Sequence, residues 1–310
     1  MSRTSPLPRI DGKGIIDMHI HVGPELLRRR YSPASLAEEA RREGIGVVMK
    51  NHFIATTGWV SQLRRPDDAV PLVGSVVLNS ACGGIDTHGI RAAFSGWKRD
   101  VSATDPDAER FVVWMPTLCA EAHLNLYGRQ DIPLAWGIRE DLARHFAEGE
   151  GLRITRPDGS LIPTLAAVLA MIAEHDLVLA SGHLDRAETK RLALEAQAAG
   201  VRRLVLTHPL YQATQLSPDE LRDLWREHGA YSELCFVNMA MDHLSIGAYA
   251  DVIRTVGPEG CILSSDVGQT FSPPLAEAMR TFFDMLRGEG IADDDIARMS
   301  VTNPHKLLFG

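Results

Sequence analysis

Eight short runs of apolar and β-branched residues, spread along the whole chain, constrain its fold more than any other feature. Runs of about four to eight such residues, bounded by turn residues, are typical of strands buried on both faces of a parallel sheet. We therefore expect eight strands, at Gly14–His19, Ile45–Lys50, Leu72–Leu78, Phe111–Pro116, Leu177–Ser181, Arg203–Thr207, Ala230–Cys235 and Cys261–Ser265.

Helical patterns with recognisable ends lie between these runs. Several begin at a serine or aspartate that can cap a helix, and several stop at a glycine. They begin at Ser32-Pro33, Asp185, Ser217-Pro218 and Ser272, and they end before Gly44, Gly200, Gly229 and Gly288. The Ser-x-x-Glu sequence at Ser217–Glu220 also has the form of a capping box.

Eight strands that alternate with helices predict a (β/α)8 TIM barrel of the α/β class. An open, doubly wound sheet is the alternative, but eight units favour closure. The sequence has no repeat or linker that would divide it, so we expect one domain over residues 12–310, preceded by an extension at residues 1–11.

Two regions are longer than the alternation requires. They are the insertions expected after the third and fourth strands, at Asn79–Pro106 and Thr117–Pro163. Within the second, Leu152–Ile162 reads as a hairpin around Pro-Asp-Gly. Such insertions overhang a barrel mouth or contribute to an oligomer contact, and we expect a homo-oligomer.

Composition and charge exclude some classes of function. The formal net charge is −8, which argues against a nucleic-acid-binding protein. No segment approaches the roughly 18 apolar residues of a membrane span, and residues 1–9 lack the apolar core of a signal peptide. The four cysteines are scattered, as in a reducing compartment. We therefore expect a cytoplasmic protein without a membrane or nucleic-acid partner.

Polar side chains gather where the predicted strands end. Catalytic groups of a TIM barrel lie at the carboxyl ends of its strands. Six of the twelve histidines fall at or just beyond these ends, together with a lysine and several carboxylates: His19, His21, Lys50, His52, Glu121, His123, His183, His208, Glu233 and Asp266.

The first strand ends in the sequence His19-Ile20-His21. Side chains two residues apart on a strand point the same way, so the two imidazoles converge. Imidazole is a favoured ligand of zinc and related ions. For His183 and His208 a hydrogen-bonding role is the alternative to ligation, and for Asp266 it is a helix cap. A one-residue error in register would turn Glu121 or Glu233 away from the site.

Lys50 ends an apolar run, where a lysine is costly to bury unless it is paired or modified. It either binds substrate as a cation or reacts with carbon dioxide to give a carbamate that bridges two metal ions; a lysine that extends to solvent is the alternative. His52 and His123 lie farther out, where substrate contacts are expected. One member of the basic cluster Arg28–Arg30, Arg28, is expected to meet an anionic substrate; otherwise this loop is merely solvated.

In this order, the motifs resemble the amidohydrolase superfamily of metal-dependent hydrolases. The resemblance covers nearly the whole chain. It rests on Asp17-Met18-His19-Ile20-His21, Gly182-His183, Thr207-His208-Pro209, Ser265-Asp266 and the closing segment Asn303–Leu308.

The resemblance implies a divalent metal, above all zinc, with manganese or iron as alternatives, in one or two copies. It implies that His19 and His21 bind a first ion, that His183 and His208 bind a second ion or contact substrate, and that Asp266 is both ligand and general base. Many members carry a bridging lysine or glutamate on the fourth strand. Here that strand ends Trp114-Met115-Pro116-Thr117, so Lys50 on the second strand is the candidate bridge. The Lys-Asn-His and Trp-Met-Pro-Thr sequences resemble an uncharacterised branch.

The expected reaction is hydrolysis of an amide, lactone or ester bond in a small, possibly anionic molecule, by a metal-activated water. Asp266 would transfer the proton, and His208 or His52 would stabilise the oxyanion. Metal-dependent decarboxylation or hydration on the same scaffold is the main alternative. A phosphoesterase of the polymerase-and-histidinol-phosphatase type is a weaker one, because Asp266-Val267-Gly268 lacks the expected late histidine. A metal-binding protein that has lost activity is the non-catalytic alternative.

Overall fold

A computed structural model describes residues 6–97, 109–128 and 151–310. All eight predicted strands are present and pair in parallel, in chain order. The third is divided into two short strands around Gly74. The strands are β3 (Ile16–His21), β4 (Gly46–Lys50), β5 (Leu72–Val73), β6 (Ser75–Val77), β7 (Val112–Trp114), β8 (Val178–Ala180), β9 (Leu204–Leu206), β10 (Ala230–Cys235) and β11 (Cys261–Ser264).

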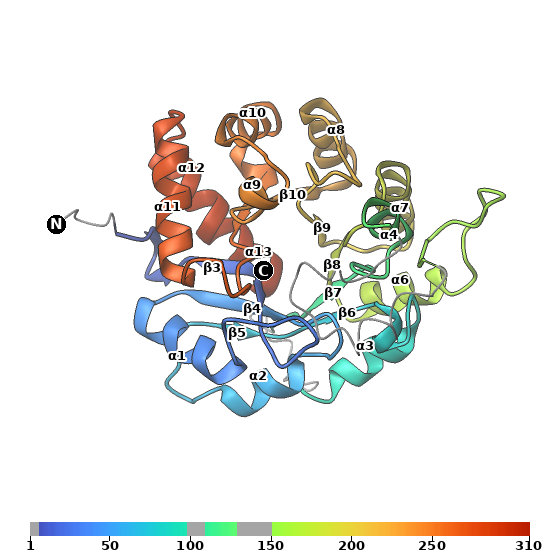
Figure 1. Ribbon diagram of the computed structural model, residues 1–310, viewed down its shortest axis with the longest axis horizontal. Helices are drawn as coiled ribbons and strands as arrows, with labels where there is room; N and C mark the ends of the chain where they lie inside the picture. Colours follow the sequence, from blue (N-terminus) through green and yellow to red (C-terminus); the bar gives the residue numbers. More distant parts are fainter. Residues whose placement is uncertain (1–5, 98–108, 129–150) are drawn as a thin grey trace.

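The strands form two sheets, β3-β4-β5 and β6-β7-β8-β9-β10-β11. Backbone hydrogen bonds of 2.8 Å run from Asp266 N to His19 O and from His21 N to Val267 O. They join the first strand to the residues that follow the last one (Figure 1). The chain therefore has an α/β fold around a parallel central sheet, as predicted.

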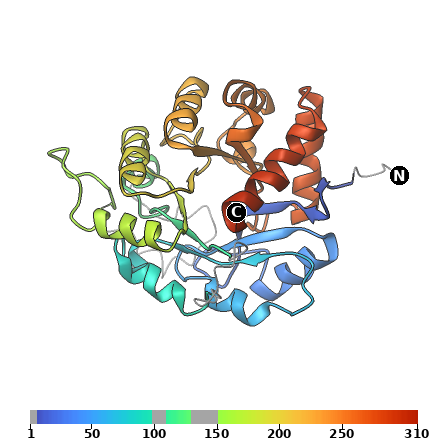
Figure 2. The same ribbon diagram turned by 180° about the vertical axis from the view of Figure 1, so that it is seen from behind.

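Helices surround the outer face of the strands in both views (Figures 1 and 2). The helices among the described residues are α1 (Pro33–Glu43), α2 (Thr57–Leu63), α3 (Thr87–Phe94), α4 (Glu121–Leu126), α6 (Leu165–Glu174), α7 (Arg186–Ala198), α8 (Pro218–His228), α9 (Asn238–Met241), α10 (Ile246–Val256), α11 (Leu275–Gly288), α12 (Asp293–Ala297) and α13 (Asn303–Phe309). No helix among the described residues is long and apolar enough to cross a membrane.

The predicted helix ends are largely confirmed. Ser32 and Ser217 accept hydrogen bonds at the starts of α1 and α8, and Gly44 and Gly229 end these helices in the left-handed conformation. The helix predicted from Ser272 begins at Leu275, three residues later. Local capping chemistry thus sets the boundaries of α1 and α8.

Apolar side chains fill both faces of the strands. Helices and the outward-facing strand residues form the larger core cluster. The inward-facing residues, among them Ile16, Val48 and Trp114, form a second cluster that includes Leu307 and Leu308 of α13. Thus α13 packs against the inner cluster, as the predicted closing helix should. His305 contacts the Gly14 carbonyl oxygen at 3.1 Å.

Two features lie outside the central sheet. Arg9–Ile10 (β1) and Lys13–Gly14 (β2) pair in an antiparallel hairpin that the sequence did not predict. The predicted hairpin around Pro157–Gly159 is present, with a bridge between Thr155 and Leu161. The insertions predicted after the third and fourth strands lie in part outside the described residues, at 98–108 and 129–150.

Asp176, in the turn before β8, holds three arginines together. Its carboxylate accepts hydrogen bonds from Arg110, Arg202 and Arg203, at 2.7–3.1 Å. Burial alone would raise the pKa of Asp176, but these hydrogen bonds outweigh it, and the pKa lies below its ordinary 3.8. The carboxylate therefore stabilises the fold above that value, and its contribution is lost as pH falls through the lowered pKa.

We predict that Asp176→Asn lowers the free energy of unfolding by about 2 kcal/mol at neutral pH. The difference from wild type should shrink at acidic pH, where the wild-type carboxylate is protonated. Urea unfolding at both pH values measures this. Asp251→Asn, which removes an exposed ion pair to Arg254, is the matched control and should change stability little. An equal loss in the two variants would contradict the prediction.

Candidate active site

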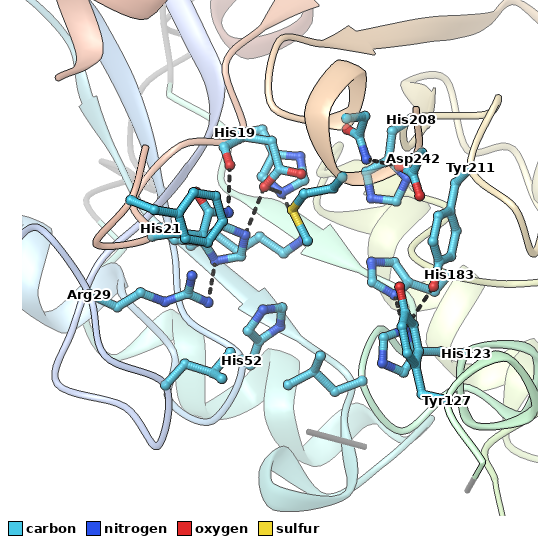
Figure 3. A pocket seen from close by; sticks show the side chains of 18 of the residues that line it. His19, His21, Arg29, His52, His123, Tyr127, His183, His208, Tyr211 and Asp242 are labelled. Carbon is cyan, nitrogen blue, oxygen red and sulfur yellow. Dashed lines mark hydrogen bonds and ion pairs between the residues drawn. The ribbon is translucent and has the colours of Figure 1, made fainter. Parts of the chain in front are cut away.

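A cavity of about 330 Å³ lies at the carboxyl ends of the strands. It brings together most of the residues predicted from the strand ends (Figure 3). Those that line it are His19, His21, Arg28, Lys50, His52, His123, His183, His208 and Asp266. Leu27, Leu118, Met241 and Phe271 add apolar surface, and Phe271 is 69% exposed.

Three predicted ligands converge on one point. The Oδ1 atom of Asp266 lies 3.1 Å from His19 Nε2 and 2.9 Å from His21 Nε2. This Oδ1 is buried and has no hydrogen-bond donor among the described residues. Asp266 also has a left-handed backbone with φ +52°, a conformation that is costly for a residue with a side chain.

Two acidic residues fix the orientation of the first strand. Glu233 on β10 is buried, with Oε2 3.2 Å from His19 Nδ1. Because a carboxylate is an acceptor, this contact favours a proton on Nδ1 and leaves the lone pair on Nε2. Asp17 accepts hydrogen bonds from the backbone N–H of His19 at 3.1 Å and of Ser265 at 3.0 Å. Burial raises the pKa of Asp17 to about 7.

Lys50 is fully buried beside the three ligands. Its Nζ lies 2.9 Å from His19 Nε2 and 4.1 Å from the centre of the Trp114 ring. Burial lowers the pKa of Lys50 and raises that of Asp266, while the attraction between the two groups opposes both shifts. Lys50 therefore does not extend to solvent, so the alternative to a buried role is wrong.

The loop after β3 uses its three arginines differently. Arg29 forms a buried ion pair with Glu25 and approaches His21 Nδ1 at 3.3 Å. Glu25 also accepts the backbone N–H of His52 at 2.9 Å. Arg30 donates to the carbonyl oxygen of Ser272. Arg28 is exposed and borders the cavity.

The opposite wall carries the remaining predicted histidines. His183 Nδ1 lies 3.1 Å from His123 Nδ1, and His123 Nδ1 lies 3.0 Å from the Tyr211 hydroxyl. The rings of His183 and His208 are 5.0 Å apart between centres. His208 has φ +27°, and its buried Nδ1 has no partner among the described residues.

Sequence reasoning missed several groups and left the roles of Glu121 and Glu233 open. Glu121 does not line the cavity and begins α4 instead. Glu233 lies behind His19 rather than in the cavity wall. The residues that sequence reasoning did not single out are Asp17 as a buried support, Glu25, Arg29, Asn79, Thr117, Tyr127, Tyr211 and Asp242. Of these, Asp17, Arg29 and Thr117 lay in short motifs that the sequence analysis had quoted.

The geometry suits a divalent metal ion. Among the described residues, one donor atom each from His19, His21 and Asp266 lie within 4.8 Å of one another. Burial lowers the pKa of His19 and His21 well below the ordinary range. Both imidazoles are therefore neutral near pH 7, the form that binds metal. An acceptor oxygen without a donor, facing two imidazole nitrogens, is the arrangement that a cation would satisfy.

Gly182 places His183 in the cavity and supports a second prediction. It has φ +61°, and a Cβ there would overlap the carbonyl oxygens of Met115 and Pro116. Gly159 also has a positive φ, of +80°, but no atom lies within 4 Å of the position that a Cβ would take. The two glycines thus share the backbone conformation and differ in the space around it.

We predict that Gly182→Ala lowers the free energy of unfolding by about 3 kcal/mol and Gly159→Ala by about 1 kcal/mol. Urea unfolding of both variants beside wild type measures the difference, which reports the steric contact with the end of β7. Equal effects would show that the contact is absent.

Comparison with known proteins identifies structures with a similar fold and a family model that matches the sequence. No curated protein matches the sequence. A solved amidohydrolase from Pseudomonas aeruginosa matches with a TM-score of 0.51 and 13% identity, over 94% of this chain and 95% of that one. At this identity the likeness concerns the fold, and in that sense the predicted resemblance to the amidohydrolase superfamily is confirmed.

Two further solved structures lie at lower TM-scores. A 2,6-dihydroxybenzoate decarboxylase from Rhizobium has a TM-score of 0.49 and 13% identity, over 95% of this chain and 98% of that one. Amidohydrolase 2 from Bifidobacterium longum subsp. infantis has a TM-score of 0.47 and 15% identity, over 94% and 97%. A family model also matches residues 14–233, which carry the predicted site residues other than Asp266 and reach Glu233 on β10. The chain therefore belongs to the family of unknown function DUF6282.

Proposed function

We propose that this protein is a metal-dependent hydrolase that cleaves an amide, lactone or ester bond of a small molecule. One observation carries the proposal. Asp266 Oδ1 is buried without a hydrogen-bond donor among the described residues, yet it lies within 3.1 Å of the Nε2 atoms of both His19 and His21. The two imidazoles and the carboxylate form a donor set that zinc, manganese and iron accept.

The proposed scaffold is a closed (β/α)8 barrel over residues 12–310. The backbone hydrogen bonds between His19 and Asp266 and between His21 and Val267 support closure. So does the parallel bridge between Ile20 and Val267. Closure brings the first and last strands side by side, as a site made of His19, His21 and Asp266 requires.

The chemistry divides between the ion and the side chains. A divalent ion bound here would supply Lewis-acid polarisation of the substrate and an activated water. Asp266, whose pKa is raised by burial, would accept a proton and pass it to the leaving group. His52, or His208 where it holds no ion, would face the substrate oxygen that gains negative charge.

Lys50 and the far histidines determine the proposed number of ions. His183 and His208 would hold a second ion, and a carbamate on Lys50 would bridge the two. The buried position of Lys50 Nζ, 2.9 Å from His19 Nε2, supports this assignment. A lowered pKa also favours the neutral amine that reacts with carbon dioxide.

The cavity mouth supports a carboxylated substrate. Arg28 is exposed there and offers a cation, while Phe271 and Leu27 offer apolar surface. His123 would contact the substrate from the opposite wall. The same features favour the second candidate function, metal-dependent decarboxylation, in which carbon dioxide is released without consumption of water. We further propose that the protein acts in the cytoplasm as a homo-oligomer.

Metal analysis tests the central proposal. We predict that protein prepared with zinc, manganese or iron holds one or two ions per chain. His21→Ala and Asp266→Asn should weaken binding by at least about 100-fold, the upper range for residues that only support ligands. His88→Ala is the matched control, since His88 lies on the surface with a side chain that is 78% exposed. Wild-type protein without ions would overturn the proposal.

In the same measurement, Lys50→Ala should lose the second ion, whereas Lys50→Glu should keep it, because glutamate also offers a bridging carboxylate. If Lys50→Ala keeps its full metal content, Lys50 does not bridge two ions. The proposed site at His19, His21 and Asp266 would still stand.

Kinetics with amide, lactone, ester and carboxylate panels separate the two reactions, because only decarboxylation releases carbon dioxide. For a carboxylated substrate we predict that Arg28→Met raises KM about fivefold with little change in kcat, as expected for an exposed ion pair worth about 1 kcal/mol. Arg42→Met is the control, on an exposed surface with Glu43. An unchanged KM in Arg28→Met would exclude Arg28 from substrate binding.

A further inference from the structure

A buried chain of hydrogen bonds links residues that follow β6 and β7 to His52, which follows β4. Asn79 follows β6, Thr117 follows β7, and His52 follows β4. Asn79 and Thr117 are both buried. His52 and Thr117 lie in the Lys-Asn-His and Trp-Met-Pro-Thr segments. His52 also lies near His21 and Glu25, with one possible ligand atom of each within 4.8 Å of the others.

The orientation of the Asn79 amide is fixed by the backbone. Its Oδ1 accepts the backbone N–H of Thr117 at 2.8 Å and of Cys119 at 3.4 Å. Its Nδ2 donates to the carbonyl oxygen of His52 at 3.1 Å and to Thr117 Oγ1 at 2.9 Å. A flipped amide would place donors against donors, so Nδ2 must be the atom that faces the Thr117 hydroxyl.

The Asn79 amide in turn determines the direction of the hydrogen bond between the Thr117 hydroxyl and His52. Among the described residues, Oγ1 has two side-chain partners, Asn79 Nδ2 and His52 Nδ1, the latter at 2.9 Å. Asn79 is a donor, so the hydroxyl accepts from it. The hydroxyl hydrogen then has His52 Nδ1 as its acceptor, because a buried O–H is costly to leave without one.

His52 therefore accepts at Nδ1. An imidazole that accepts a hydrogen bond at Nδ1 carries no hydrogen on that atom, so the ring has a single N–H. That hydrogen must be on Nε2. Figure 3 shows the His52 ring projecting into the cavity. Glu25, a carboxylate close to His52, is already engaged by Arg29 and by the His52 backbone N–H.

We infer that Asn79 and Thr117 are positioning residues that hold His52 as an Nε2–H donor, aimed at a substrate oxygen that gains negative charge. The inference rests on the proposed function for the identity of that oxygen. It assigns His52 a role as a hydrogen-bond donor and excludes it as an Nε2 ligand of a metal. A substrate with a carbonyl or carboxylate oxygen fits such a donor.

The tautomer is measured directly by nitrogen NMR of the full chain, labelled at histidine with ¹⁵N and loaded with zinc, a diamagnetic ion. The His52 signals are assigned by their absence in His52→Gln. We expect wild-type His52 to carry its proton on Nε2. Thr117→Val removes the hydroxyl and should shift the proton population toward Nδ1, whereas Thr117→Ser should restore the wild-type pattern.

A wild-type His52 protonated on Nδ1, or bound to zinc through Nε2, overturns the inference. So does a Thr117→Val spectrum that is identical to wild type at His52. The other cavity histidines report whether the Thr117→Val fold is intact, since their signals should not move. These outcomes do not depend on turnover, so failure of the proposed reaction and failure of this inference are distinguishable.

Discussion

The buried carboxylate of Asp17 joins the first strand to the last, and the rest of the site depends on this contact. Asp17 accepts hydrogen bonds from the backbone of His19 and from the backbone and hydroxyl of Ser265. Ser265 directly precedes Asp266, so one residue sets both the seam between the strands and the approach of Asp266 to His19. Its hydrogen bonds offset only part of the cost of burying the charged carboxylate, since burial still raises the pKa of Asp17 to about 7. Fold and candidate metal site are therefore built by the same contact.

Buried charged side chains around the cavity are paired with one another. Lys50 and Arg29 are cations, while Glu25, Glu233 and Asp266 are carboxylates whose surroundings differ. Arg29 pairs with Glu25, and Glu233 faces His19, which leaves Asp266 opposite Lys50 and the two imidazoles. A buried group of this kind is stable only when each charge has a partner. Under the proposed function a divalent ion completes the set around Asp266, and a carbamate would remove the positive charge of Lys50.

Sequence patterns predict the parts of this structure that depend on local chemistry. The strands follow from apolar runs, and the helix ends follow from Ser32, Ser217, Gly44 and Gly229. Placing polar residues at strand ends was enough to gather His19, His183 and Asp266 in one cavity, because parallel strands end at the same edge of a sheet. The role of Glu121 stayed open because no pattern fixed where the loop after β7 turns into α4.

Sequence patterns could not predict the contacts between segments that are distant in the chain. Asn79, Thr117 and Tyr211 are ordinary polar residues in the sequence, and their roles arise from partners on neighbouring loops. Arg28, Arg29 and Arg30 look equivalent as a basic cluster, yet only their packing separates an exposed cation from a buried ion pair. The pairing of β1 with β2 likewise depends on two very short strands that carry no periodic signal.

Gly268, two residues beyond Asp266, gives the seam a further property. Its φ is +129°, and a Cβ there would overlap the carbonyl oxygen of His21. The two backbones therefore touch with no side chain between them, and the bond from His21 N to Val267 O holds them together. Because the backbones are in contact, the distance between the first-strand histidines and Asp266 cannot increase easily. Under the proposed function, rigid spacing of this kind would favour small ions with bonds of about 2.0–2.2 Å over calcium, which needs about 2.3–2.6 Å and more oxygen ligands.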